Sequence, residues 1–186
     1  VANEDEVKAM YAATAERFGG IDVLYNNAGI SPADDDSILV TEEDAWDRVQ
    51  EANTKGAHFC CKHGIPYLLE RGGGSVINVA SFVAILGAAT SQISYTASKG
   101  AVLSLTLAMA ADHVADGIRV NCVNPGTVDT PWVARLLEQA GGADQERLGL
   151  VDPTFGQGQD GLRLGHRALP SGALPQPGGS LGPLQA

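Results

Sequence analysis

Residues 75–126, SVINVASFVAILGAATSQISYTASKGAVLSLTLAMAADHVADGIRVNCVNPG, decide the fold of this chain. They open with residues 75–80, which are apolar and β-branched enough for a buried strand. Residues 95–114 are rich in Ala, Leu and Met, which favours a helix, and Gly117 stops it. Residues 118–123 form another apolar strand, closed by a turn at residues 124–126. A strand, a helix and a strand in this order predict a βαβ unit with parallel strands.

The same alternation extends toward the N-terminus. Asn3 and Thr41 are each followed three residues later by an acidic residue, a pattern that caps a helix start. The elements expected there are a helix over residues 3–18, a strand over 21–25, a helix over 41–49 and a long helix over 53–69. We therefore expect a partial doubly wound, Rossmann-like parallel sheet with flanking helices.

The composition changes near Asp152, after one further short helix expected over residues 133–139. From Pro153 to Ala186 there are 8 Gly and 5 Pro in 34 residues, without apolar periodicity. Such a composition is typical of disorder. We expect residues 1–152 to form one domain and residues 153–186 to be a disordered Gly/Pro-rich tail.

The formal charge of -10 and the pI near 4.6 argue against nucleic acid or an anionic membrane surface as the main partner. Acidic runs at residues 34–36 and 42–44 account for part of this charge, and we expect them in solvated loops and helix starts. No apolar run reaches 18 residues, so no membrane-spanning helix is predicted.

Three cysteines, Cys60, Cys61 and Cys122, form no CxxC pair. Adjacent cysteines rarely bridge each other, so the simpler interpretation is a reduced, cytoplasmic protein. His58 and His63 lie near Cys60 and Cys61, but the spacing matches no common zinc pattern, and we predict no metal site.

Tyr95 and Lys99 are four residues apart on the predicted helix and so share one face. A free tyrosine titrates near ~10, and an adjacent ammonium lowers the pKa of a phenol by roughly 1–3. Tyr95 could then exchange a proton with a substrate hydroxyl. Taken alone, the pair is weak evidence, because a tyrosine and a lysine at this spacing are more often a packed ring beside a solvated amine.

Five segments resemble, in order, motifs of the short-chain dehydrogenase/reductase family. They are Asn26-Asn27-Ala28-Gly29, Glu51-Ala52-Asn53-Thr54, Asn78-Val79-Ala80-Ser81, Tyr95-Thr96-Ala97-Ser98-Lys99, and Asn124-Pro125-Gly126 with Thr130-Pro131. The resemblance covers residues 1–140 and is nearest to bacterial 3-oxoacyl-carrier-protein reductases and sugar or sugar-acid dehydrogenases. It implies an oxidoreductase that uses NAD or NADP to interconvert a small-molecule carbonyl and a secondary alcohol, and that forms a homo-oligomer.

The resemblance also implies a role for each matching residue. The catalytic residues would be Asn53, Ser81, Tyr95 and Lys99. Tyr95 would be the general acid or base, Lys99 would lower its pKa and hold the nicotinamide ribose, Ser81 would bind the reacting oxygen, and Asn53 would anchor a water. The cofactor groove would be lined by Asn27, Ala28, Gly29, Tyr95, Lys99, Pro125, Gly126, Val128 and Thr130.

One of these assignments has an alternative, and another has an unusual spacing. Asn53 could simply cap its helix. Ser81 lies 14 residues before Tyr95, one more than is usual in the family, and we place the extra residue in the loop over residues 88–94.

The family's Gly-rich phosphate-binding turn should lie some tens of residues before Asn26, and only 25 residues precede it here. We expect the first three strands, two helices and the residue that selects NAD or NADP to be lacking. Residues 156–161 spell GxGxxG, but no strand precedes them and no sustained helix follows, so we do not assign them to a dinucleotide site. A shifted reading frame near residue 155 would explain the tail. The alternative function is a non-catalytic fragment or interaction module.

Overall fold

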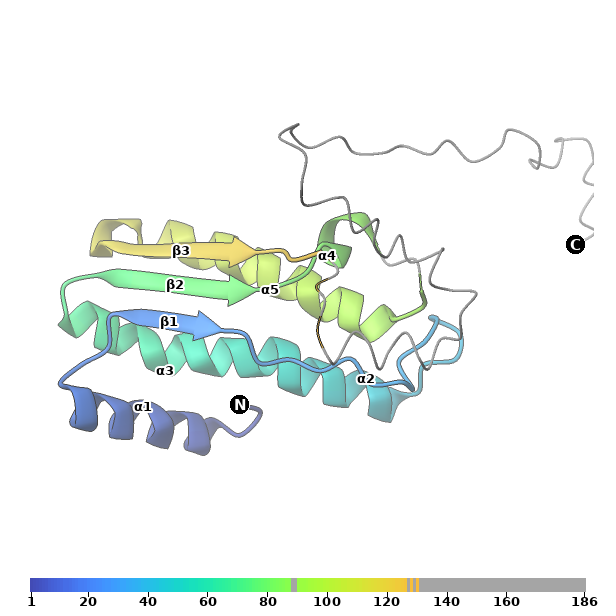
Figure 1. Ribbon diagram of the computed structural model, residues 1–186, viewed down its shortest axis with the longest axis horizontal. Helices are drawn as coiled ribbons and strands as arrows, with labels where there is room; N and C mark the ends of the chain where they lie inside the picture. The colour runs from blue at the N-terminus through green and yellow to red at the C-terminus, as the bar shows by residue number, and fades with distance from the viewer. Residues whose placement is uncertain (88–89, 127, 129, 131–186) are drawn as a thin grey trace, which may run out of the picture. The chain divides into compact units, whose positions relative to one another are not determined.

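The computed structural model describes residues 1–87, 90–126, 128 and 130 (Figure 1). The expected short helix over residues 133–139, the tail over 153–186 and the GxGxxG segment within it lie outside these residues.

Three parallel strands form the described sheet, and their arrows point the same way in Figure 1. They are β1 (Val23–Asn26), β2 (Gly74–Val79) and β3 (Ile118–Val123), in the order β1-β2-β3. Leu24 lies opposite Val76, and Val76 lies opposite Val120. The three strands confirm the parallel sheet expected from the alternation of apolar segments.

Helical segments connect and precede the strands. They are α1 (Glu4–Phe18), α2 (Glu43–Val49), a π-helical turn η1 (Gln50–Lys55), α3 (Gly56–Glu70), α4 (Val83–Leu86), α5 (Ile93–Asp112) and a 3-10 turn η2 (Val114–Asp116). The long helix expected over residues 53–69 is therefore the end of η1 followed by α3. The short helix α4 was not expected from the sequence.

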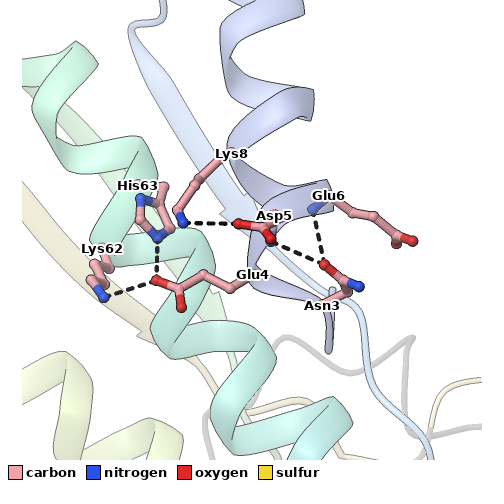
Figure 2. Close-up of polar contacts among 7 residues, drawn as sticks. All are labelled: Asn3, Glu4, Asp5, Glu6, Lys8, Lys62 and His63. Carbon is pink, nitrogen blue, oxygen red and sulfur yellow. Dashed lines mark hydrogen bonds and ion pairs between the residues drawn. The ribbon is translucent and has the colours of Figure 1, made fainter.

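The two predicted helix caps have different outcomes. The Asn3 cap is confirmed, because its Oδ1 accepts from the backbone N–H groups of Asp5 and Glu6 at 3.0 and 3.1 Å (Figure 2). The Thr41 cap is wrong. Thr41 Oγ1 accepts instead from the backbone N–H of Asp36 at 2.8 Å, so this hydroxyl stabilises the preceding loop.

Helices α1, α3 and α5 contribute to one hydrophobic core on one face of the sheet. Its members include Val7, Tyr11, Leu24, Cys61, Leu68, Val76, Met109 and Val120. At Gly64 of α3, an added Cβ would lie 2.6 Å from Leu24 Cδ1. The close approach of α3 to β1 therefore requires glycine at this position.

The other face of the sheet is exposed in the described part of the chain. Side chains alternate along a strand, so the buried Leu24 marks the helix-covered face, and its neighbours Val23 and Tyr25 point the opposite way. Val23 is 55% exposed and Tyr25 is 62% exposed. Within the described residues, no helix is long and apolar enough to cross a membrane.

Candidate active site

A cavity of about 380 Å³ lies where the three strands end. It is lined by Asn27, Gly29 and Ile30 after β1, by Val79, Ala80 and Ser81 at the end of β2, by Tyr95 and Lys99 of α5, and by Pro125, Gly126, Val128 and Thr130 after β3. Ligands of doubly wound sheets bind in the crevice outside the carboxyl ends of the strands. The place and the size both suit a small-molecule site.

The cavity brings together most of the residues that the sequence singled out. Two of them do not line it: Ala28, and Asn53, which lies directly behind the wall. Three lining residues were missed by the sequence interpretation, namely Ile30, Val79 and Ala80. Val79 and Ala80 lie within the Asn78–Ser81 motif and Ile30 follows the Asn26–Gly29 motif, but an apolar side chain at a strand end carries no chemical signal of its own.

Tyr95 lies in the first turn of α5, and burial raises the pKa of its phenol above the usual value near 10. A hydrogen bond with the Ser81 side chain acts in the opposite direction and lowers it. The lowering of this pKa expected from Lys99 is therefore not found. The desolvation of the phenol outweighs the favourable contact, so Tyr95 holds its proton more firmly than a free tyrosine.

Lys99 follows one helical turn later, as expected, and its side chain is buried. Its Nζ lies 5.6 Å from the centre of the Tyr95 ring and donates a 2.9 Å hydrogen bond to the carbonyl of Val79. Burial lowers the pKa of this ammonium. The ammonium thus contacts the end of β2 as well as the cavity.

Asn53 is buried in η1 and connects three parts of the site. Its Oδ1 accepts from the backbone N–H of Ile30 at 2.7 Å, and its Nδ2 donates to the carbonyl of Ile30 at 2.9 Å and to Ser98 Oγ at 3.0 Å. Ser98 belongs to α5, between Tyr95 and Lys99. Asn53 is therefore not a helix cap: it joins the wall after β1 to the helix that carries Tyr95.

Ser81 lies two residues after the end of β2 and is buried. The backbone around it is bonded to β3 and its following turn, because Ala80 N–H donates to the carbonyl of Val123 at 2.9 Å and Phe82 N–H to that of Pro125 at 3.0 Å. The Asn-Pro-Gly turn thus packs beside Ser81. This pairing brings the hydroxyl next to Tyr95.

A buried polar network lies beneath the cavity. Asn78 is fully buried in β2; its Oδ1 accepts from Asn26 Nδ2 at 2.8 Å and its Nδ2 donates to Thr106 Oγ1 at 2.9 Å. Cys61 Sγ lies 3.2 Å from Asn26 Nδ2, and burial raises the pKa of this thiol to about 12. The network joins β1, β2, α3 and α5. Cys61 thus serves as a protonated packing group.

Asp35 was missed by the sequence interpretation, which placed residues 34–36 in solvent. Asp35 is only 5% exposed, and both of its carboxylate oxygens accept from backbone N–H groups at the start of α5. The signal for it was indirect: Gln92, just before this helix, is a poor capping residue.

The residues present fit the nicotinamide half of a dinucleotide. A Cβ at Gly29 would lie 3.2 Å from Asn53 Oδ1 and 3.3 Å from Lys99 Nζ, so a side chain at this position would crowd the ammonium. A Cβ at Gly126 would meet nothing within 4 Å, so Gly126 borders open space. Ammonium, hydroxyl and amide groups around this space suit ribose hydroxyls and a carboxamide.

The comparisons with known proteins agree with this geometry. The family described as enoyl-(acyl carrier protein) reductase matches residues 1–148. The chain is 43% identical to 2-(R)-hydroxypropyl-CoM dehydrogenase of Xanthobacter autotrophicus, over 78% of this chain and 58% of that protein. It is 38% identical to 3-oxoacyl-[acyl-carrier-protein] reductase of Thermotoga maritima, over 75% of this chain and 56% of that protein.

Meso-2,3-butanediol dehydrogenase of Serratia marcescens is 43% identical over 81% of this chain and 58% of that protein. The chain thus spans about half the length of these relatives. A crystal structure described as a short-chain dehydrogenase/reductase from Burkholderia xenovorans superposes with a TM-score of 0.70 at 30% identity, covering 74% of this chain and 54% of that one. Fold, motif geometry and relatives agree: the chain belongs to the short-chain dehydrogenase/reductase family of oxidoreductases.

Proposed function

We propose that this chain carries the catalytic half of an oxidoreductase that interconverts a carbonyl and a secondary alcohol with NAD or NADP. The observation that supports this best is the convergence of Ser81, Tyr95 and Lys99 on one cavity at the strand ends. Dehydrogenases of this family use NAD or NADP, and the groups around Gly29 and Gly126 suit the nicotinamide end.

In reduction, the Tyr95 phenol donates its proton to the substrate oxygen, and in oxidation its phenolate accepts that proton. When bound, the nicotinamide cofactor supplies or accepts the hydride at the substrate carbon. The Ser81 hydroxyl donates a hydrogen bond to the same oxygen and stabilises the negative charge that develops there. Because burial raises the pKa of Tyr95, its acid form is available throughout the neutral range.

Lys99 and Asn53 support these steps. The Lys99 ammonium binds the ribose hydroxyls and stabilises the phenolate after proton transfer. The Asn53 side chain holds the backbone of Ile30 and the hydroxyl of Ser98. It keeps that wall in place, and a water anchored there would carry protons between Lys99 and solvent.

The remaining cofactor contacts come from the loops after β1 and β3. We assign them to Asn27, Ala28, Gly29, Pro125, Gly126, Val128 and Thr130. We further propose a domain over residues 1–152 with a separate tail over 153–186, a homo-oligomer, and a cytoplasmic location.

The substrate classes to test are suggested by the names of the relatives. Their names include a 3-oxoacyl reductase, a 2,3-butanediol dehydrogenase and a 2-keto-3-deoxy-L-fuconate dehydrogenase. The test is a panel of 3-oxoacyl thioesters, vicinal ketols and keto sugar acids, each with NADH and NADPH, followed by the absorbance of the reduced nicotinamide. We expect turnover of one class that is lost in Tyr95→Phe. Turnover that survives in this variant contradicts the proposal.

A further inference from the structure

The start of α5 lacks a cap from its own sequence. A helix leaves the N–H groups of its first turn without partners inside the helix, and a preceding Ser, Thr, Asp or Asn commonly accepts from them. Here the preceding residue is Gln92, whose side chain makes no capping bond, and the first turn contains no acidic residue. The turn that carries Tyr95 therefore depends on acceptors from elsewhere in the chain.

Asp35 supplies these acceptors from a loop that is distant in sequence. Its Oδ1 accepts from the N–H of Ser94 at 2.9 Å, and its Oδ2 accepts from the N–H of Tyr95 at 2.7 Å. Hydrogen bonds to an ionised carboxylate are among the stronger ones in proteins. The negative charge also lies at the positive end of the helix dipole. One buried side chain thus holds the backbone of the residue that carries the phenol.

The neighbouring backbone completes the first turn. The N–H of Ile93 donates to the carbonyl of Asp36 at 3.0 Å, and that of Thr96 donates to the carbonyl of Gln92 at 3.0 Å. Asp35 and Asp36 together therefore accept from three consecutive N–H groups of α5. The preceding carboxylate, Asp34, turns outward and pairs with Arg48 at 2.5 Å, so the acidic run is divided between solvent and helix.

The same loop reaches the cavity wall. It begins with Gly29 and Ile30, which line the cavity, and Ile30 is held by Asn53. The loop is therefore anchored at one end beside the cofactor groove and at the other end, through Asp35, to Tyr95. A change at the Asp35 anchor would alter the position of the phenol relative to that wall.

We propose that Asp35 is a positioning residue for Tyr95, whose carboxylate holds the first turn of α5 and thereby fixes the phenol in the cavity. The inference rests on the proposed function of Tyr95 and names the group that aligns it. A misplacement of about 1 Å can cost on the order of 100-fold in rate. Turnover should therefore depend on a carboxylate that contacts neither substrate nor cofactor.

The test uses two variants, Asp35→Ala and Asp35→Asn, and both are expected to remain folded. Ser94 keeps other bonds, because its Oγ donates to the carbonyl of Trp46 at 3.1 Å and its own carbonyl accepts from Gln50 Nε2 at 3.0 Å. Asn3→Ala is the matched control. Asn3 also accepts from two N–H groups of a first turn, but in α1, which contributes no residue to the cavity.

The first readout is turnover. We expect Asp35→Ala to lower kcat about 10- to 100-fold, with little change in the cofactor KM, and Asp35→Asn to lie between it and the unmodified protein, since one acceptor oxygen remains. Asn3→Ala should keep kcat within about twofold, although it loses stability. A kcat for Asp35→Ala equal to that of Asn3→Ala overturns the proposal.

The second readout needs no turnover. In protein labelled with 13C at the tyrosine ζ carbon, the Tyr95 signal is identified by its loss in Tyr95→Phe. Burial raises the pKa of this phenol, so a loosened first turn that admits water should bring the pKa back toward the ordinary value and speed exchange of the Tyr95 amide proton. Asp35→Asn should show a smaller change than Asp35→Ala.

The two readouts separate the two proposals. Unmodified protein that turns over no substrate, while Asp35→Ala still changes the Tyr95 titration, contradicts the enzymatic function and supports the positioning. Wild-type titration and amide exchange in Asp35→Ala overturn the positioning, whatever happens to turnover. The Tyr95 pKa could also shift equally in Asp35→Ala and Asp35→Asn, without faster exchange of the Tyr95 amide proton. That result would reveal a pure charge effect and would also overturn the positioning role.

Discussion

Lys99 Nζ donates a 2.9 Å hydrogen bond to the backbone carbonyl of Val79, the last residue of β2. The bond ties α5 to the carboxyl end of the central strand. It also uses one of the three donors of the ammonium and leaves the others for the cavity. The residue that holds α5 to the strand end thus also lines the cavity.

Tyr95→Phe should lower turnover by about 10²–10⁴-fold and leave cofactor affinity nearly unchanged. The phenol transfers a proton in the transition state but adds little to dinucleotide binding. Steady-state kinetics and a fluorescence titration of the reduced cofactor measure the two effects. Tyr25→Phe is the control, because Tyr25 lies exposed on β1, and it should behave as the unmodified protein. Equal losses in the two variants would remove Tyr95 from the mechanism.

Lys99→Met should impair both turnover and cofactor affinity, because in the proposed function one ammonium serves the phenol and the ribose. The Met side chain keeps most of the buried volume while removing the charge and the bond to Val79. Lys55→Met is the comparison, since Lys55 is exposed and pairs only loosely with Glu51 at 3.6 Å. A Lys99→Met protein with unchanged cofactor affinity would contradict the assignment to the ribose.

The pH dependence should differ between the two reaction directions. Burial raises the pKa of Tyr95, so the phenol stays protonated through neutral pH and the phenolate forms only in alkaline solution. Oxidation uses the phenolate, and its rate should therefore rise with pH across the alkaline range. Reduction uses the phenol and should stay level around neutral pH.

Ser81→Ala tests the cause of this profile. The Ser81 side chain lowers the pKa of Tyr95 through a hydrogen bond, so its removal should move the alkaline rise of oxidation to higher pH. Ser104→Ala, on the exposed side of α5, should leave the profile in place. A profile that moves to lower pH in Ser81→Ala would show that the hydrogen bond has the opposite effect.

The contact between α1 and α3 should make stability sensitive to acid. Glu4 Oε1 lies 2.8 Å from Lys62 Nζ and 2.7 Å from His63 Nε2, and hydrogen bonds from these two groups lower the pKa of Glu4 from 4.5 to about 2 (Figure 2). A carboxylate with a lower pKa in the folded state stabilises the fold above its unfolded pKa, and this stabilisation disappears as the pH falls through the folded pKa. The contribution is thus complete above about pH 4.5 and is lost toward pH 2.

Urea unfolding midpoints of the unmodified protein and Glu4→Gln measure this effect. The two midpoints should differ at neutral pH and converge between pH 4.5 and about 2. Glu6→Gln removes the same charge from the same helical turn without touching α3, and its difference should be smaller. If Glu4→Gln and Glu6→Gln behave alike, the charge at the start of α1 matters and the contact to α3 does not.

The sheet face of Val23 and Tyr25, which is exposed among the described residues, should make residues 1–186 self-associate. Val23 and Tyr25 expose apolar surface there, and in the described sheet β1 is hydrogen-bonded to β2 alone, a combination that favours pairing with a second copy. Val23→Lys should shift the protein toward monomer in size-exclusion chromatography with light scattering. Leu39→Lys removes a residue that is 90% exposed in a loop and should change nothing. Equal effects of the two substitutions would point to general solubility.

The sequence by itself determined the strands, the main helices and the relation between Tyr95 and Lys99. These features depend on short-range physics: alternation for strands, a 3.6-residue period for helices and a four-residue spacing for groups on one helix face. The cap at Asn3 is of the same kind, because its partners are two and three residues away. Motif order then placed Ser81 and Gly126 near the same strand ends.

Tertiary structure alone decided which polar groups are buried and what they contact. In the sequence, Asp35 is one of three consecutive acidic residues. Only the tertiary structure brings it to Ser94 and Tyr95, about 60 residues away in the sequence, and so removes it from solvent. The direction in which the pKa of Tyr95 shifts likewise depends on the atoms that exclude water from the ring. The spacing of residues along a helix does not specify those atoms. Long-range packing therefore set both the chemistry of the phenol and the support of its helix.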